Sequence, residues 1–181
     1  VDVFEGGEGD DRLFGGTGAD IYHFARGDGR DTITDLGGAD RIVLGADIVA
    51  TDLAVVQVGN DVELRVNNDG GRIRIVDALA GGSAVETVVF ADGTTWTWAE
   101  VISRSLQATS GDDTLIAPAT VSGVGTLLDG KAGNDALHGS AGADTLTGGD
   151  GNDRLEGGAG DDTYVFARGD GQDLILDNAG I

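Results

Sequence analysis

The chain has 181 residues, of which 33 are glycine, one is proline and none is cysteine or methionine. Eleven Lys and Arg residues against 32 Asp and Glu residues leave a net charge of −21 at pH 7, which opposes binding to nucleic acid or to an anionic membrane surface. The lack of cysteine excludes disulfides and thiolate metal sites, and no apolar run reaches the roughly 18 residues of a transmembrane helix. We therefore expect a metal cation as the partner.

A nine-residue repeat begins at the N-terminus. It reads GGEGDDRLF at 6–14, GGTGADIYH at 15–23 and, after two extra residues, RGDGRDTIT at 26–34. Asp stands at position 6 of each unit and a large apolar residue at position 8. We expect Tyr22 and Ile33, which precede and follow the two-residue slip, to end this first roll and to cover its last coil.

The composition changes near residue 36, where the repeats give way to β-type alternation. We expect strands at 41–44, 72–76 and 85–90, a short helical turn within 46–53 and a β-hairpin over 55–66. Thr97 and Glu100 form a helix N-capping pattern.

The aspartates of this middle segment, Asp35, Asp40 and Asp92, are expected to be turn residues. We expect Trp96 and Trp98 to pack in the interior; the alternative is that they form a platform for sugar stacking.

The repeat returns in the second half of the chain. It reads GKAGNDALH at 130–138 and continues in one register, with the same two-residue slip, to RGDGQDLIL at 168–176. The segment 109–116 resembles a unit that has lost its glycine pair. Thr126 stands where Asp belongs, so we expect a turn without metal there, with 117–120 as an inserted bulge. Tyr164 and Ile175 are expected to cover the end of this second roll.

The repeat has a simple physical consequence. Three residues with one inward side chain make a very short strand, and glycines at positions 1, 2 and 4 permit tight turns. Two units make one coil of 18 residues, so units two apart stack. The aspartates of a stack, such as Asp135 and Asp153, then lie about 4.8 Å apart. Such carboxylates repel unless a cation lies between them, and carboxylate and carbonyl oxygens favour Ca²⁺.

The register resembles the GGxGxDxUx motif of the RTX (repeats-in-toxin) family, a calcium-binding nonapeptide repeat. The resemblance covers roughly residues 1–35 and 106–181. It implies an all-β fold of two parallel β-rolls with Ca²⁺ between successive coils. Residues 36–105 are similar to the haemolysin-type calcium-binding-related domain through the phrase FADGTTW at 90–96. That similarity implies a small β-rich connecting domain packed on the ends of both rolls.

The family resemblance also implies the ligands of each ion, which are turn carbonyls and position-6 carboxylates. In the first block they are Gly7, Gly9 and Asp11 facing Arg26, Asp28 and Asp31, with a half-site of Asp2, Gly15, Thr17 and Asp20. In the second block the first two sets are Thr109, Gly111 and Asp113 facing Gly130, Ala132 and Asp135, and Lys131, Gly133 and Asp135 facing Gly148, Asp150 and Asp153. The last two are Ser140, Gly142 and Asp144 facing Gly157, Ala159 and Asp162, and Gly149, Gly151 and Asp153 facing Arg168, Asp170 and Asp173. We expect about six Ca²⁺ ions.

Catalysis finds no support in the residues. His23 and His138 both stand at position 9 of a repeat, without an acid partner or a metalloprotease motif. The RGD triplets at 26–28 and 168–170 are explained by the register, so we do not expect adhesion through them. We expect no catalytic residue and no organic cofactor.

The sequence thus favours a structural, calcium-folded module of a larger bacterial protein. The resemblance implies export by a type I secretion system and a secreted or cell-surface location, and we expect this chain alone to be a monomer. Without calcium we expect disorder, because the carboxylates repel and the apolar core is thin. The alternative is an adhesive or glycan-binding module of a surface protein that uses the middle domain. The missing start Met predicts that the parent protein has more segments, and a toxin, lipase or protease domain is one possibility; no secretion signal is recognisable in this chain.

Overall fold

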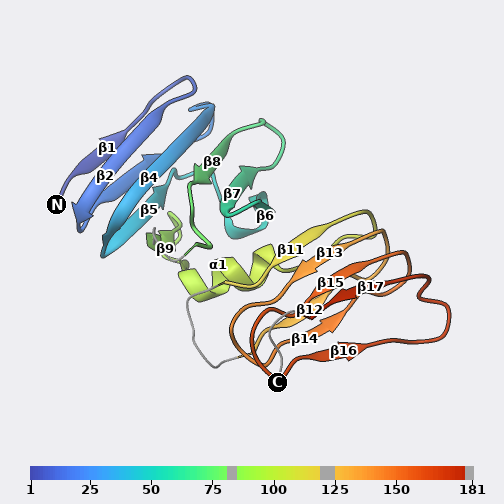
Figure 1. Ribbon diagram of the computed structural model, residues 1–181. Helices are drawn as coiled ribbons and strands as arrows, with labels where there is room; N and C mark the ends of the chain where they lie inside the picture. Colours follow the sequence, from blue (N-terminus) through green and yellow to red (C-terminus); the bar gives the residue numbers. More distant parts are fainter. Residues whose placement is uncertain (81–84, 119–124, 178–181) are drawn as a thin grey trace. The chain divides into compact units, whose positions relative to one another are not determined.

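The computed structural model describes residues 1–80, 85–118 and 125–177. It divides into two compact units, Val1–Ser105 and Leu106–Ile181, which are described separately here (Figure 1). Short parallel strands dominate both units, so the expected all-β fold with parallel rolls is confirmed.

The second unit consists of seven three-residue strands within the described residues. They are β11 (Thr114–Ile116), β12 (Leu127–Asp129), β13 (Ala136–His138), β14 (Thr145–Thr147), β15 (Arg154–Glu156), β16 (Thr163–Val165) and β17 (Leu174–Leu176). Successive strands alternate between two parallel sheets, ordered β11-β13-β15-β17 and β12-β14-β16. Units two apart therefore pair, as the 18-residue coil predicts.

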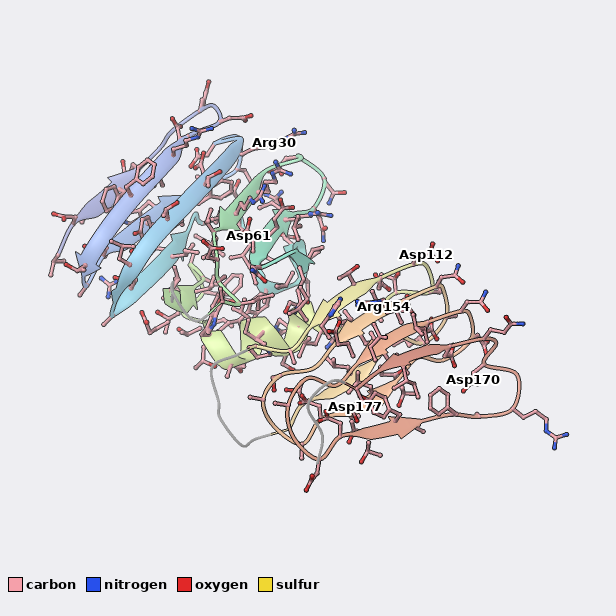
Figure 2. All side chains as sticks on the ribbon, viewed as in Figure 1. Arg30, Asp61, Asp112, Arg154, Asp170 and Asp177 are labelled. Carbon is pink, nitrogen blue, oxygen red and sulfur yellow. The ribbon has the colours of Figure 1, made fainter. Side chains whose placement is uncertain are left out.

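The middle residue of each strand faces the space between the two sheets. Leu128, Leu137, Leu146 and Leu155 are fully buried there, and Tyr164 packs against the same cluster. The flanking residues of a strand point outward: Arg154, labelled in Figure 2, lies on the outer face of β15 and pairs with Glu156 at 3.1 Å. The core cluster contains Leu115, Ala108 and Ala117 as well, whereas Ile175, the middle residue of β17, is 41% exposed.

In the first unit the repeat strands belong to two sheets. One sheet holds β1 (Val3–Glu5), β3 (Ile21–Phe24) and β5 (Asp40–Leu44), all parallel, followed by β9 (Val85–Val89) and β10 (Thr95–Thr97). The other holds β2 (Arg12–Gly18), β4 (Arg30–Gly38) and β8 (Arg72–Ile75), all parallel, followed by β7 (Asp61–Val66) and β6 (Leu53–Val58). Each sheet thus begins with repeat strands and ends with strands of the middle segment.

The elements expected in the middle segment are present. The hairpin is β6–β7, the short helical turn is η1 (Ala50–Asp52), and the helix is α1 (Trp98–Ser105). Thr97 caps this helix: its Oγ1 accepts a hydrogen bond from the Glu100 N–H, and the Glu100 carboxylate accepts one from the Thr97 N–H at 2.8 Å. These contacts confirm the capping pattern read from the sequence.

The expected roll end is wrong for the first unit, whereas in the second unit the expected residues lie on the last strands. Tyr22 and Ile33 do not end the first roll, because β3 pairs with β5 and β4 pairs with β8. The middle segment supplies the next strand to each sheet, so both side chains lie in the interior at 1% exposure. In the second unit, β16 and β17 are the last strands of the described residues, and Tyr164 and Ile175 lie on them. The boundary predicted at residue 36 falls inside β4, and the three-part division of the chain stays a prediction.

The leucine stack predicts a large loss of stability when one member is truncated. Leu137→Ala removes a side chain with 0% exposure from between two sheets that cannot collapse onto the cavity. We expect a loss of about 2–5 kcal/mol in the free energy of unfolding, measured by urea denaturation in saturating calcium. Leu127→Ala is the control, since that side chain is 69% exposed and its truncation is expected to change stability by about 0.5 kcal/mol or less. Equal losses in the two variants would contradict the inward assignment.

Candidate metal sites in the aspartate stacks

The position-6 aspartates form ladders that run across the coils of each unit. The backbone N–H of one Asp donates to Oδ1 of the Asp in the next coil. In the second unit this bond is 2.8 Å from Asp135 to Asp153, 3.0 Å from Asp153 to Asp173 and 2.9 Å from Asp144 to Asp162. In the first unit it is 2.7 Å from Asp2 to Asp20 and 3.1 Å from Asp11 to Asp31. The structure therefore brings the predicted aspartate pairs together.

The second carboxylate oxygen of these residues is buried without a partner. Among the described residues, Oδ2 is buried and makes no hydrogen bond in Asp11, Asp20, Asp31, Asp40, Asp135, Asp153 and Asp162. A buried anionic oxygen without a partner is costly, and native proteins pair such atoms with a donor or a cation. Because the orphaned atoms recur at one position of a repeat, they fit a series of cation sites between the coils.

Glycine at position 1 keeps these sites open. A Cβ atom added at Gly6 would lie 2.9 Å from Oδ2 of Asp11 and 3.1 Å from Oδ2 of Asp31. A Cβ at Gly148 would lie 2.8 Å from Cγ of Asp153. A side chain at position 1 would thus fill the space that the orphaned carboxylate oxygens face.

The turns that carry the predicted carbonyl ligands also face one another. Parallel bridges join Gly9 with Gly29, Ala132 with Asp150, and Gly151 with Gly171. The carbonyls of Gly9, Asp28, Lys131, Ser140, Asp150 and Asp170 accept hydrogen bonds of 2.6–3.0 Å from the facing turns. A carbonyl oxygen has two lone pairs, so these bonds leave one for a cation. The role of each carbonyl as a ligand stays a prediction.

In two of the carboxylates that the repeat places at sites, Oδ2 has a local hydrogen-bond partner. Oδ2 of Asp113 accepts hydrogen bonds from N–H and Oγ1 of Thr109, at 2.7 and 2.9 Å. Oδ2 of Asp144 accepts one from the Ser140 N–H. In the preceding coil the ladder position is occupied by Thr126. Its N–H donates to the Asp144 carboxylate, but its side chain carries no charge. Residues 119–120 of the predicted bulge lie outside the described residues.

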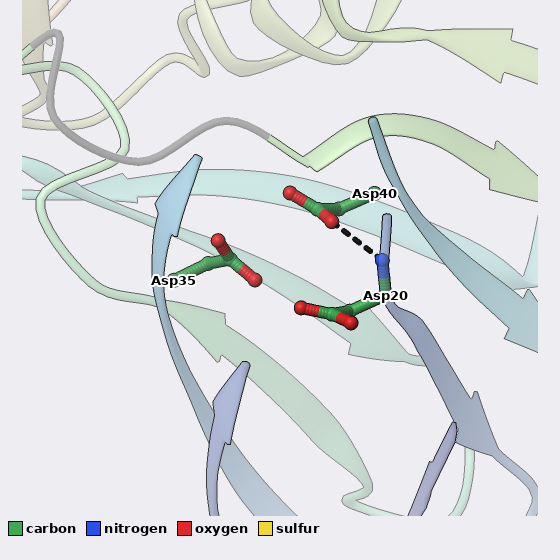
Figure 3. Close-up of side chains that lie close together, drawn as sticks. All are labelled: Asp20, Asp35 and Asp40. Atoms are coloured by element: carbon green, nitrogen blue, oxygen red, sulfur yellow. Dashed lines mark hydrogen bonds between the residues drawn. The ribbon is translucent and has the colours of Figure 1, made fainter. Parts of the chain in front are cut away.

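The expectation that Asp35 and Asp40 are turn residues is wrong, because they lie in β4 and β5. Both are buried, at 2% and 1% exposure, and Asp40 continues the ladder by accepting a hydrogen bond of 2.7 Å from the Asp20 N–H (Figure 3). The signal was present in the sequence: residues 35–43, DLGGADRIV, keep the nine-residue register, with Asp40 at position 6 and Ile42 at position 8. The loss of the glycine pair at positions 1 and 2 hid this unit. Asp92 is an exposed turn residue as expected, with Oδ1 accepting from the Thr94 N–H.

Glu86 extends the same ladder by one further rung. The Asp40 N–H donates to the Glu86 carboxylate, at an irregularity in the pairing of β5 with β9. This residue comes 46 positions after Asp40 and outside any repeat. Sequence reasoning had no pattern by which to find it.

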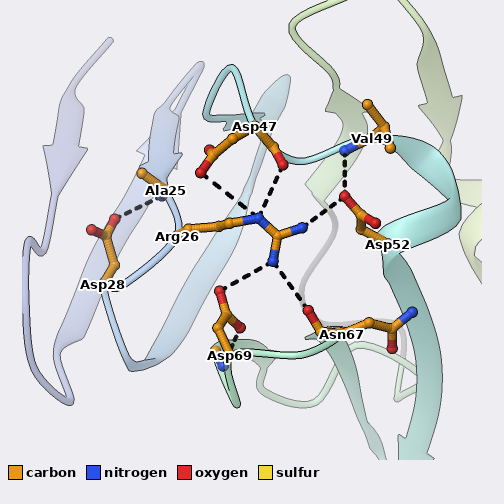
Figure 4. Close-up of polar contacts among 9 residues, drawn as sticks. Ala25, Arg26, Asp28, Asp47, Val49, Asp52, Asn67 and Asp69 are labelled. Carbon is orange, nitrogen blue, oxygen red and sulfur yellow. Dashed lines mark hydrogen bonds and ion pairs between the residues drawn. The ribbon is translucent and has the colours of Figure 1, made fainter.

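The first RGD triplet has a structural role (Figure 4). The Arg26 guanidinium binds the Asp52 carboxylate at 2.7 Å and the carbonyl oxygens of Asp47 and Asn67 at 3.0 Å each. Asp28 points back to its own turn, where Oδ2 accepts a hydrogen bond of 2.8 Å from the Ala25 N–H. Arg26 thus ties the last repeat turn of the first block to the loops around η1 and after β7.

Trp96 is not available as a sugar platform. Its side chain is 4% exposed, packs edge-on against Phe90 with ring centroids 4.8 Å apart, and is covered by the Arg104 guanidinium 4.0 Å from the ring centroid. The expected packing role of Trp96 is confirmed. Trp98 is half-buried at the start of α1.

The buried carboxylates are electrostatically unfavourable without a cation. Burial raises the pKa of Asp31, Asp40, Asp135 and Asp153, hydrogen bonds from backbone N–H groups offset part of the rise, and neighbouring carboxylates raise each pKa further. A raised pKa means that the folded chain binds these protons more tightly than the unfolded chain does. Proton binding therefore stabilises the metal-free fold below the usual aspartate pKa, and this contribution is lost as pH rises through the raised pKa.

Acidification is thus expected to favour the fold in chelator. Lowering the pH from about 7 to about 4.5 should increase the β-sheet signal in far-UV circular dichroism when calcium is absent. In a calcium titration the same change should raise the calcium concentration at the folding midpoint, because protons and metal compete for the same oxygens. A β signal in chelator that falls on acidification would contradict the assignment of these carboxylates.

The ladder also predicts that some aspartates contribute more to calcium affinity than others. Asp153 lies between Asp135 and Asp173 and has an orphaned Oδ2, whereas Oδ2 of Asp113 is held by Thr109. Asp153→Ala should therefore raise the calcium concentration at the folding midpoint several-fold more than Asp113→Ala. Equal midpoints in a calcium titration of the two variants would show that the register is wrong.

The comparisons with known proteins agree with this geometry. The model of the RTX calcium-binding nonapeptide repeat matches residues 1–28, 27–48 and 129–164, and its second match includes Asp35 and Asp40. The model of the haemolysin-type calcium binding protein related domain matches residues 61–100. No curated protein matches the chain. The chain thus carries RTX calcium-binding nonapeptide repeats in both units and, between the two sets of repeats, the haemolysin-type calcium binding protein related domain.

Proposed function

We propose that this chain is a non-catalytic module that folds when calcium binds and that belongs to a bacterial protein exported by type I secretion. The observation that carries the proposal is the set of buried, unpartnered Oδ2 atoms in the aspartate ladders. Calcium, when bound, supplies positive charge between carboxylates that otherwise repel. The family matches indicate a calcium-binding structural repeat and no catalytic family.

The ladders support a stoichiometry of about six ions. Six divalent ions would offset twelve of the 21 net negative charges of the chain. The aspartate pairs that would hold them are Asp11 with Asp31, Asp113 with Asp135, Asp135 with Asp153, Asp144 with Asp162, Asp153 with Asp173 and, at the N-terminus, Asp2 with Asp20.

Export and folding are linked in this proposal by the calcium gradient across the cell envelope. Where free calcium is low the aspartates repel and the chain stays extended, which suits passage through a secretion channel. Outside the cell, sites with dissociation constants on the order of 10⁻⁴–10⁻³ M fill and the rolls fold. RTX repeats are typical of secreted bacterial proteins, and the described part of the chain contains no helix that is long and apolar enough to cross a membrane.

Two measurements on the purified chain test this function. Small-angle X-ray scattering in chelator should give a radius of gyration near 45 Å, roughly that of an unfolded chain of this length. In about 5–10 mM calcium the radius of gyration should fall to about 16–25 Å. Equilibrium dialysis should find about six bound ions at saturation. A compact chain in chelator, or no bound calcium, would contradict the proposal; magnesium at the same concentration is the control.

A further inference from the structure

Three carboxylates converge at one place in the first unit. Asp20 lies just before β3, Asp35 lies in β4 of the opposite sheet, and Asp40 begins β5 (Figure 3). Each residue contributes one carboxylate oxygen, and these three oxygens all lie within 4.8 Å of one another. All three residues are buried. Within residues 1–80, 85–118 and 125–177, this is the one group of three acidic or histidine side chains that meet so closely.

The orphaned oxygens point to a ligand in this cluster. Oδ2 of Asp20 and Oδ2 of Asp40 are buried without a hydrogen-bond partner, although both residues are only 1% exposed. Ca²⁺ binds oxygen at 2.3–2.6 Å, so oxygens on opposite sides of one ion are about 4.6–5.2 Å apart. The separation in the cluster therefore suits a single Ca²⁺ held by three carboxylates.

Asp35 is held in the cluster by dedicated contacts. The Tyr22 hydroxyl donates to its Oδ2, and the Gly37 N–H donates to its Oδ1 at 2.8 Å. Gly15 leaves the necessary space, because a Cβ atom there would collide with the Tyr22 hydroxyl and with Oδ2 of Asp35. Asp35 itself stands at position 1 of its unit, where the other well-matched units have glycine or arginine. Its carboxylate is therefore an addition to the ordinary ladder pair.

The sequence around Tyr22 and Asp35 recurs in the second unit. The pattern Tyr-x-Phe-Ala-Arg-Gly-Asp-Gly-x-Asp-x-Ile-x-Asp spans both 22–35 and 164–177, so Asp177 corresponds to Asp35 and Tyr164 to Tyr22. Burial raises the pKa of the Tyr164 hydroxyl, a hydrogen bond from the Gly157 N–H lowers it, and the charge of Asp177 raises it further. The aspartate thirteen residues after the tyrosine is thus a repeated feature of this chain.

We propose that Asp20, Asp35 and Asp40 form a three-carboxylate Ca²⁺ site that binds more tightly than the two-carboxylate sites of the first unit and fills before them. Calcium affinity rises with the number of charged ligands, so a third carboxylate separates this site from the Asp11–Asp31 pair. Since Asp35 comes from β4 and the other two aspartates from the opposite sheet, the ion joins the two sheets where the repeats give way to the middle segment. Tyr22 is a positioning residue for Asp35. The inference rests on the proposed calcium binding.

The test is a calorimetric titration of the whole chain with Ca²⁺, in the wild type and in Asp35→Asn. We expect the tightest class of sites to weaken by about tenfold or more in the variant, while the weaker sites keep their affinity. Tyr22→Phe should weaken the same class to a smaller extent. Asp92→Asn is the matched control, since Asp92 is an exposed turn residue and its variant should titrate like the wild type.

A second measurement distinguishes a ligand from a merely structural residue. Asp35→Asn removes one of three mutually repelling buried charges, so in chelator its β signal should equal or exceed that of the wild type. In calcium its stability should be lower than the wild type. A β signal below that of the wild type in chelator, or an unchanged tight class in the calcium titration, would overturn the proposal. If the wild type binds no calcium, the proposed function itself fails; if it binds calcium with Asp35→Asn unchanged, only this inference fails.

Discussion

The main physical constraint on this structure is the repulsion between carboxylates that are stacked one strand spacing apart. Strand pairing places the position-6 aspartates of neighbouring coils in direct succession, and one oxygen of each is used in the ladder of backbone hydrogen bonds. The other oxygen is left buried and unpaired in most of them. Within the described residues no donor bonds these atoms, and the position-1 glycines leave space beside them. In the proposed function a cation occupies that space.

The apolar core of the second unit is built from few side chains. The strands β11 to β16 contribute one inward side chain each, from Leu115 to Tyr164, and Ala108 and Ala117 complete the cluster. In the first unit the middle segment enlarges this core, because β8 and β9 carry the parallel sheets onward and α1 follows with its own buried residues. The first unit thus has conventional packing in addition to the ladders.

Much of this architecture was accessible from the sequence because the repeat couples position to environment. A period of nine with Asp at 6 and an apolar residue at 8 predicts both the inward leucines and the stacked carboxylates, and pairs such as Leu137 with Leu155 confirm the register. The capping contacts of Thr97 and Glu100 were likewise predictable, since they lie within one turn of helix. Patterns of this kind are local or strictly periodic.

The parts that sequence reasoning missed depend on contacts distant in the chain. Asp40 was obscured because its unit lacks the glycine pair, although its register was intact. The placement of Asp35 between Asp20 and Asp40 requires β4 to pass opposite β3 and β5, and Glu86 meets Asp40 only because β9 pairs with β5. The continuation of both repeat sheets by β8 and β9 could not be read from the composition. The composition changes sharply near residue 36, whereas both sheets continue past that point.

The most direct test of the account is far-UV circular dichroism of the chain during a calcium titration that starts in chelator, with magnesium as the control. The account predicts little β signal in chelator, a cooperative gain with calcium, and no comparable gain with magnesium, because only calcium readily accepts the 6–8 oxygens that such sites offer. A full β signal in chelator would contradict it, since the aspartate ladders would then be stable without any cation between them.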